Sequence, residues 1–300
     1  MSYRLKRKEP VPAGIKRLAA EQIEEASSQL ASGKNREAAV HEARKCVKKT
    51  RGLLSLASYQ QEDKRLRDIG RALSAIRDAT VIVETFDTLL EKHNATLKKE
   101  QLASVRRELA QAPEFREGIE RALTGLRAIR GRSETWPLHT DGFAAVEEGL
   151  TASYRRGRKR LRLAEKTGDA HDFHEFRKSA KEHWYHMRLF EGLWPEPVGA
   201  RVAALKDLET WLGEHHNLDV LRGKLPKEPQ EAIQLFLALV ETEQKELERN
   251  SISLARRLYE QKPKPFVRDL SKLWDVWHEE AKLPPRKQAV PSISKRSKTA

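Results

Sequence analysis

Two segments of this sequence carry the same cationic and histidine residues at the same spacing. HEARKCVKKTR occupies residues 41–51 and HEFRKSAKEHW occupies residues 174–184, and the two agree at His, Glu, Arg and two Lys positions. An arginine presents a planar fork to phosphate oxygens and a lysine presents a compact charge, so a row of both suits a ligand with several phosphates. A single such helix is usually a solvated basic face, but its recurrence predicts a surface that binds a phosphate-rich anion.

Each segment has two chemically distinct sides when it is drawn as a helix of about 100° per residue. The cations of the first segment gather on one side, and Ala43 and Val47 lie on the other. The second segment repeats this division, with Phe173 and Phe176 broadly opposite its cations. Like charges one turn apart destabilise a helix by about 0.2–0.5 kcal/mol per pair. Two such rows therefore indicate an anion that neutralises them.

The candidate binding residues are cations and histidines on these two helices or on a third basic segment, YRRGRKRLR at 154–162. They are His41, Arg44, Lys45, Lys48, Lys49, Arg51, Arg155, Arg156, Arg158, Lys159, His174, Arg177, Lys178, Lys181 and Arg188. For a second set a solvated surface is an equal alternative: Lys16, Arg17, Arg67, Arg71, Arg77 and Lys206. Neighbouring cations favour neutral His41 and His174 in the free protein, and a bound phosphate would draw a proton back. We therefore expect proton uptake on binding near pH 7, with a structural hydrogen bond as the alternative role of each histidine.

The elements that position these residues are helices, because apolar residues recur at helical spacing and runs rich in β-branched residues are nearly absent. The sequence predicts an all-α protein in which glycine and proline clusters separate the helices. We expect helices at about 14–31, 36–59, 62–92, 95–111, 115–130, 141–167, 171–192, 198–221, 229–261 and 265–282.

A second pair of similar segments follows the first pair in the same order, LRDIGRALSAIRDATVI at 66–82 and LKDLETWLGEHHNLDVL at 205–221. An internal repeat of this length indicates two copies of one structural unit. We therefore predict two similar helical bundles related by a pseudo-twofold axis. The expected parts are a basic N-terminal tail at 1–13, a first bundle at 14–135, a second bundle at 136–282 and a disordered basic tail at 283–300.

The net charge of +14, from 58 Lys and Arg against 44 Asp and Glu, also points to an anionic partner. Residues 1–10 contribute +3 and residues 284–300 contribute +5, so the two ends supply more than half of the excess. We expect these ends to add nonspecific attraction. A specific site must come from local clustering on the folded surface.

Several observations place the protein in the cytoplasm without a membrane partner. The mean hydropathy is -0.72, and no stretch approaches the roughly 18 apolar residues that a membrane span needs. The N-terminus lacks the apolar core of a secretory signal. Cys46 is the only cysteine, so an internal disulfide and a cysteine-based zinc site are excluded, as fits a reducing compartment.

Taken together, the paired motifs resemble the conserved histidine α-helical domain (CHAD) family. HEARK and HEFRK carry the resemblance with RDATV at 77–81, HNLDV at 216–220 and YRRGR at 154–158, and it spans about 14–282. The resemblance implies that 14–282 form one domain of two four-helix bundles around a basic central groove or pore. It also implies binding of inorganic polyphosphate and attachment to polyphosphate granules.

Two positions depart from the family pattern. Trp184 stands where family members commonly have Arg, and Glu182 stands opposite Lys49. The second repeat is therefore expected to contribute less to binding at this turn of the helix.

We predict a non-enzymatic module that binds inorganic polyphosphate and uses neither a cofactor nor a metal, with protein partners unspecified. One alternative is a nucleic-acid-binding helical protein. The lack of aromatic residues interleaved with the basic ones argues against it. Another is a polyphosphate or triphosphate hydrolase, which would need a carboxylate cluster for Mg²⁺. The ETEQK string at 241–245 fits the ExExK signature of triphosphate tunnel enzymes, but its surroundings have helical rather than strand spacing. For the pairs His183/His186 and His215/His216 we expect a role in packing or in a polar network and not in metal binding.

Overall fold

The computed structural model describes residues 3–32, 35–110, 116–226 and 230–282, apart from the side chains of 75–79 and 116. These residues form eleven helices and no strand, which confirms the predicted all-α class. The helices are α1 (Val11–Ser32), α2 (Arg36–Leu56), α3 (Asp63–Ala72), α4 (Ser74–Lys92), α5 (Lys99–Leu109), α6 (Arg116–Ser133), α7 (Ala144–Thr167), α8 (Ala170–Leu189), α9 (Pro195–Arg222), α10 (Glu231–Leu258) and α11 (Pro263–Glu280). No helix among them is long and apolar enough to cross a membrane.

The two helices that carry the repeated motif, α2 and α8, both begin at a side-chain cap. The Asn35 side chain accepts a hydrogen bond from the backbone N–H of Ala38 at 3.1 Å, and the Asp169 side chain accepts one from that of His171 at 2.7 Å. Such caps satisfy N–H groups that the first turn of a helix leaves unpaired. Gly168, just before the second cap, has a φ of 63°, which lets α7 end and α8 begin within a short turn.

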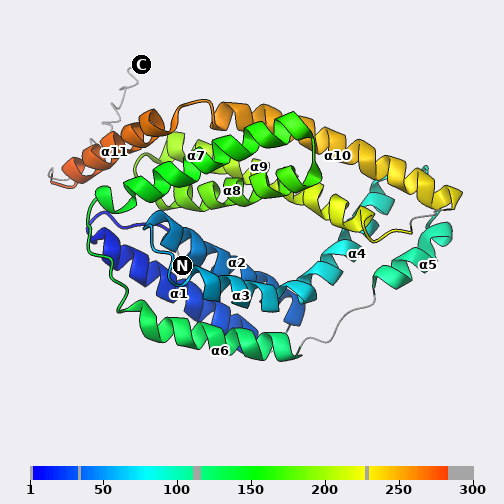
Figure 1. The fold of residues 1–300 in the computed structure, drawn as a ribbon, viewed down its shortest axis with the longest axis horizontal. Coiled ribbons are helices and arrows are strands. Elements are labelled where there is room, and N and C mark those ends of the chain that lie inside the picture. The colour runs from blue at the N-terminus through cyan, green and yellow to red at the C-terminus, as the bar shows by residue number, and fades with distance from the viewer. Residues whose placement is uncertain (1–2, 33–34, 111–115, 227–229, 283–300) are drawn as a thin grey trace, which may run out of the picture.

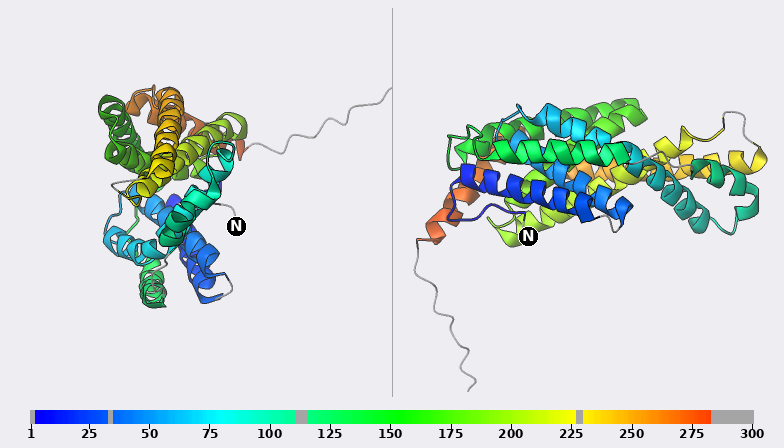
Figure 2. Two further views of the ribbon diagram at one scale, coloured as in Figure 1. Left: turned by 90° about the vertical axis from the view of Figure 1, so that its right-hand side faces the viewer. Right: turned by 90° about the horizontal axis from the view of Figure 1, so that it is seen from below.

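The helices form two neighbouring groups, seen in the lower and upper halves of Figure 1. Helices α1, α2, α3 and α6 pack together in one group, and α7, α8, α9 and α10 pack in the other. Contacts of α2 with α7 and α8 join them, and one hydrophobic cluster continues across both. Figure 2 shows the elongated shape that results, with the group of α7 to α10 lying over the other. The pseudo-twofold relation and the bundle boundaries stay predictions.

The single helix expected over 62–92 is two helices, which meet at Leu73. Leu73 is fully buried in the cluster that joins the two groups, whereas Ile82 and Phe86 of α4 belong to a second cluster. That second cluster combines α4 and α5 with the far ends of α9 and α10, at the right of Figure 1. The residues before the break pack into the first cluster and those after it pack into the second, so the chain changes helix at Leu73.

Residues before α1 pack on the body of the protein instead of extending from it. Tyr3 and Leu5 are buried, at 3% and 5% exposure. The Leu5 N–H donates to the Leu189 carbonyl at 3.3 Å, and the Tyr3 hydroxyl donates to the Lys49 carbonyl at 3.0 Å. The segment expected as a tail over 1–13 is thus packed from Tyr3 onward, and α1 already begins at Val11. The expected tail at 283–300 lies outside the described residues.

A glycine sets how closely the two groups approach. At Gly149 of α7, a Cβ atom would lie 2.1 Å from the carbonyl oxygen of Leu56, at the end of α2. Real Cβ atoms never come so near, so only glycine lets the backbones meet here. This contact positions α7 beside α2 at the site described next.

Candidate functional site

The two repeated motifs lie next to each other, because α2 packs against α8. Residues that correspond in the repeat also interact across this contact. Lys181 acts electrostatically on its counterpart Lys48, and Arg44 acts on its counterpart Arg177. The contact therefore concentrates like charges contributed by both halves of the chain.

The pKa of Lys48 is lowered by burial and by this concentration of positive charge. This pKa falls from 10.5 to about 7, first because the ammonium is buried and then because Lys181, Arg44 and Arg177 add positive charge around it, which Glu209 opposes only in part. Burial disfavours a charged group, and neighbouring charges of the same sign act in the same direction. An anion bound here would reverse both effects.

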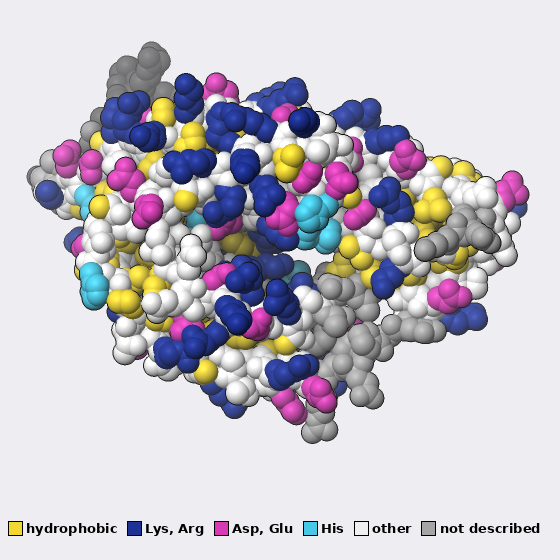
Figure 3. Space-filling model, in the orientation of Figure 1, with side chains coloured by type: hydrophobic (Ala, Val, Ile, Leu, Met, Phe, Trp, Pro, Cys, Tyr) yellow, Lys and Arg dark blue, Asp and Glu magenta, His cyan; other side chains and the backbone are white. Residues whose placement is uncertain are grey.

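A cleft of about 420 Å³ opens on one side of this contact, between α2, α3, α7 and α8. Figure 3 shows a central hollow around which Lys and Arg side chains gather. Seven basic residues line the cleft against three acidic ones, an excess of positive charge. The basic residues are Lys48, Arg51, Arg156, Arg160, Arg177, Lys178 and Lys181, and the acidic ones are Asp63, Glu175 and Glu182.

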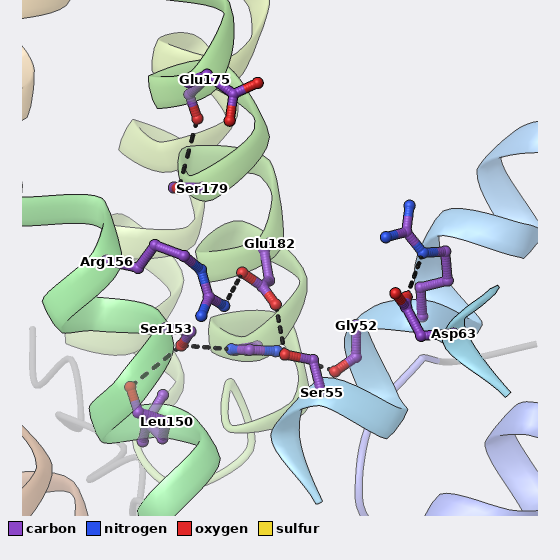
Figure 4. A network of polar contacts seen from close by, with 11 residues as sticks. Gly52, Ser55, Asp63, Leu150, Ser153, Arg156, Glu175, Ser179 and Glu182 are labelled. Atoms are coloured by element: carbon purple, nitrogen blue, oxygen red, sulfur yellow. Dashed lines mark hydrogen bonds and ion pairs between the residues drawn. The ribbon is translucent and has the colours of Figure 1, made fainter. Parts of the chain in front are cut away.

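The acidic residues of the cleft hold its arginines in place. Arg51 donates to Asp63 at 2.7 Å, and Arg156 donates to Glu182 at 2.5 Å. Glu182 also accepts a 2.5 Å hydrogen bond from the Ser55 hydroxyl, so it links α7, α8 and α2 (Figure 4). Burial opposes ionisation of Glu182, but positive charge and these bonds outweigh it and lower its pKa. Glu182, which interrupts the basic row of the second motif, thus orients the Arg156 side chain in the cleft.

His186 is fully buried beneath this network and connects the same helices. Its Nε2 lies 2.9 Å from the Gly52 carbonyl and its Nδ1 lies 3.0 Å from the Ser153 hydroxyl. Burial lowers its pKa, so a neutral ring donates through Nε2 and accepts at Nδ1. His186 thus has a polar-network role, whereas both ring nitrogens of His183 are buried without a hydrogen-bond partner and its ring packs 5.2 Å from that of Tyr154.

A buried carboxylate of α9 pairs with cations of the second motif. Glu209 of α9 is 5% exposed and pairs with Arg177 at 3.4 Å, with Lys206 at 3.0 Å and with Lys181. Burial opposes its ionisation, but these cations outweigh burial and lower its pKa to about 2. Two cations that line the cleft are therefore also partners of an internal anion.

A cluster of aromatic rings and cations lies beyond Glu209. Arg188 lies over both Trp184 and Tyr3, at 5.1 and 5.3 Å from the ring centroids. Lys206 lies 5.2 Å from the Trp184 centroid, and Lys49 lies 5.5 Å from that of Tyr3. Three predicted binding residues are therefore held by cation–π contacts outside the lining of the cleft.

His174 is not surrounded by cations alone. Its ring stacks on His216 with centroids 4.0 Å apart, and its Nδ1 is buried without a hydrogen-bond partner. Its pKa is lowered to about 4, first by burial and then by His216, Lys178 and Arg177. The expected neutral form of His174 follows, with burial as its main cause. His41 is exposed near the start of α2.

Arg158, predicted as a binding residue, points to a different part of the fold. Its guanidinium donates to the carbonyls of Tyr259, Glu260 and Gln261, at the end of α10. On the same helix, Arg155 and Lys159 are exposed and do not line the cleft. Only Arg156 of the four predicted residues in this segment reaches the cleft.

The remaining predicted residues with described side chains do not line the cleft, and each has a partner in the structure, which for Arg67 is the cleft residue Asp63. Lys45 pairs with Glu42, Arg17 with Glu9 and Glu21, Arg67 with Asp63, and Arg71 with Asp68, while Lys16 donates to the Glu134 carbonyl and Arg44 to that of Ser74. The side chain of Arg77 lies outside the described part of the structure.

One basic residue of the cleft was not among the predicted ones. Arg160 lines the cleft and pairs with Glu175 at 3.3 Å. It lies four residues after Arg156, one helical turn away, so the side of α7 that carries Arg156 also carries Arg160. That spacing was the signal available in the sequence.

The structure also places the motifs that were set aside. Glu241 pairs with Lys245, whereas Glu243 pairs with Lys92 at 2.7 Å and with His93 at 3.1 Å. The two carboxylates of the ETEQK string lie on α10, as the helical spacing predicted, and they have different partners. Over the described ranges, no three His, Cys, Asp or Glu side chains are grouped to hold a metal ion.

Comparison with known proteins identifies the family. The family model of the CHAD domain matches residues 14–226. The chain belongs to the CHAD family. Its fold is similar to the crystal structure of the CHAD domain from the plant Ricinus communis, with a TM-score of 0.55 and 19% sequence identity over 91% of this chain and 95% of that chain. No curated protein gives a significant match.

Proposed function

We propose that this CHAD protein binds inorganic polyphosphate in the cleft between α2, α3, α7 and α8, and that it does so without catalysing a reaction. The observation that carries the proposal is the excess of cations that the two repeated helices bring to one cleft. The expected attachment to polyphosphate granules would follow from such binding.

A linear polyphosphate suits this cleft better than a single small anion does. Its charges are spaced along a chain, and the cations of the cleft come from three helices that meet along one opening. Arginines already oriented by carboxylates lose little conformational freedom when a phosphate oxygen approaches. Release of counterions adds a favourable contribution that falls steeply with salt.

The experiment is a binding titration with long-chain polyphosphate at about physiological salt, repeated with single-stranded and duplex DNA. Arg156→Gln removes a cleft cation, and Arg155→Gln removes the neighbouring exposed cation as a matched control. We expect Arg156→Gln to weaken polyphosphate binding about tenfold, the size of one charge-assisted hydrogen bond. Arg155→Gln should change it less than about twofold.

The alternatives give different results in the same experiment. Equal binding of all three polyanions, or equal effects of the two variants, would mean that diffuse positive charge carries the affinity. A nucleic-acid-binding protein would prefer DNA. A hydrolase would release phosphate from polyphosphate when Mg²⁺ is added, which we expect not to happen.

A further inference from the structure

Glu209 occupies a position that an anionic ligand would otherwise take. Its carboxylate is buried and contacts three cations, Arg177, Lys181 and Lys206. Arg177 and Lys181 also line the cleft. The arrangement is a complete oxyanion site in which the anion belongs to the protein itself.

The first repeat has no carboxylate at the equivalent position of its sequence. When 66–82 is aligned with 205–221, the position of Glu209 is occupied by Gly70. A Cβ at Gly70 would meet only Val47, at 4.0 Å. Among the described residues, no carboxylate forms an ion pair with Lys48, the counterpart of Lys181, and Glu209 acts on Lys48 only through longer-range electrostatics. The two halves of the site are therefore chemically unequal although their basic motifs match.

We infer that Glu209 is a built-in competitor of the ligand, which neutralises Arg177 and Lys181 so that the phosphates are bound mainly by Lys48 and the other cations of the cleft. This inference rests on the proposed function and specifies which cations of the site take the ligand. The competitor is permanent, because the carboxylate stays ionised at every pH at which the protein would work. It limits affinity for all polyanions and keeps Arg177 and Lys181 ordered when no ligand is bound.

Glu209→Gln tests the inference with little change in shape. The amide keeps the size of the side chain but loses its charge, so Arg177 and Lys181 become available to the ligand. Asp207→Asn is the matched control, since Asp207 is exposed on the same helix and its loss changes the net charge equally. We expect Glu209→Gln to tighten binding of inorganic polyphosphate about tenfold, equivalent to about 1.4 kcal/mol. The slope of log K against log salt should steepen by about one, and Asp207→Asn should do neither.

A second pair of variants leaves Glu209 untouched. Lys48→Met and Lys181→Met each remove one cation at equivalent positions of the repeat. Because Glu209 engages only Lys181 directly, Lys48→Met should cost more polyphosphate affinity than Lys181→Met. This comparison tests the inference even if the Glu209→Gln variant does not fold.

The outcomes separate the two proposals. Equal affinity of Glu209→Gln and Asp207→Asn, or equal losses in the two lysine variants, would overturn the inference while leaving polyphosphate binding intact. Weaker binding by a folded Glu209→Gln would instead make Glu209 a positioning residue for Arg177 and Lys181. If the unmodified protein binds no polyphosphate, the proposed function fails and this inference fails with it.

Discussion

Lys48 and Lys181 occupy the same position in two copies of one motif, and they meet where α2 packs against α8. Their electrostatic states differ. Burial lowers the pKa of both lysines, that of Lys48 to about 7, but only Lys181 has Glu209 as an ion-pair partner. A protein gains nothing in stability from a buried ammonium without a counter-ion. The position of Lys48 is understandable if an external anion supplies the missing negative charge.

The first prediction is that polyphosphate binding takes up a proton at Lys48. With a pKa of about 7, Lys48 is mostly neutral at pH 8 in the free protein. A bound polyanion favours the ammonium, so the pKa rises on binding and a proton must be taken up. Affinity should therefore fall as the pH rises from 7 to 9. Calorimetry at pH 8 in buffers of different ionisation enthalpy measures the uptake, which should approach one proton.

Lys48→Met should abolish that uptake, and Lys45→Met is its control because Lys45 lies on the same helix, pairs with Glu42 and does not line the cleft. The folded pKa of Lys48 is below its unfolded value, so charging it in the folded state costs stability, and the cost is largest below about pH 7. Lys48→Met should therefore not lower the Tm at pH 7. Unchanged proton uptake in Lys48→Met would exclude Lys48 as the titrating group.

This assignment revises the expectation that His174 takes up the proton. The pKa of His174 is about 4, so a bound phosphate would have to raise it by about three units before the ring gained a proton at pH 7. Protonation of His174 belongs to acidic solution, near pH 4 to 5. Uptake near neutral pH is better explained by the lysine whose pKa already lies there.

The second prediction concerns Arg158, which binds backbone carbonyls at the end of α10. Arg158→Gln should lower the free energy of unfolding by about 1.5–3 kcal/mol, the range for hydrogen bonds to a charged group. Polyphosphate affinity of the folded protein should stay within about twofold, because Arg158 does not line the cleft. Urea unfolding and a binding titration measure the two effects. Lys159→Gln, at an exposed neighbour, should change neither the stability nor the affinity. A large loss of affinity in Arg158→Gln would mean that Arg158 does belong to the binding site.

The contrast between Lys48 and Arg158 shows what sequence could predict about the site. The repeated spacing placed Lys48 and Lys181 on equivalent faces, and equivalent elements of a repeat commonly meet, so their proximity could be expected. Arg158 is likewise a cation in a basic segment, but its partners lie about one hundred residues later in the chain. No local pattern encodes that contact, because it depends on where α10 ends relative to α7.

The same distinction holds for the fold. Apolar spacing predicted the helical class and most helix positions, since each helix must bury one side. The break at Leu73 was not predicted because the backbone stays in the α region there, and the nearby Gly70 lies within α3 and not at the break. It is set by the two hydrophobic clusters, which only the complete fold defines. The partnership of Glu209 with cations of α8 is likewise a product of tertiary packing.

The third prediction tests the close approach of α7 to α2. Gly149→Ala would place a methyl group 2.1 Å from the Leu56 carbonyl oxygen, so the helices must separate. We expect a loss of at least about 3 kcal/mol in the free energy of unfolding, at the upper end for overpacking. Gly131→Ala is the control, because nothing lies within 4 Å of a Cβ at that helical position. It should be neutral or stabilise by up to about 1 kcal/mol. Equal unfolding curves for the two variants would show that the contact at Gly149 is not tight.

The fourth prediction separates the cleft from the basic C-terminal end. Residues 284–300 carry five cations and no carboxylate, so their removal lowers the net charge by five. Charge that is not clustered in a shaped site attracts polyanions through counterion release alone and does not distinguish among them. Truncation after Leu283 should therefore weaken binding of polyphosphate and of DNA by similar factors, and the preference for polyphosphate should persist.

Charge reversal at Arg44 and Lys48 removes two cations of the first motif and changes the net charge by four, slightly less than the truncation does. It should nevertheless cost more polyphosphate affinity, because these residues lie where the two repeats meet. Titrations of both variants against polyphosphate and DNA, at two salt concentrations, make the comparison. Equal losses of polyphosphate affinity in the two variants, or a loss of the preference for polyphosphate on truncation, would mean that the C-terminal end and not the cleft provides the specificity.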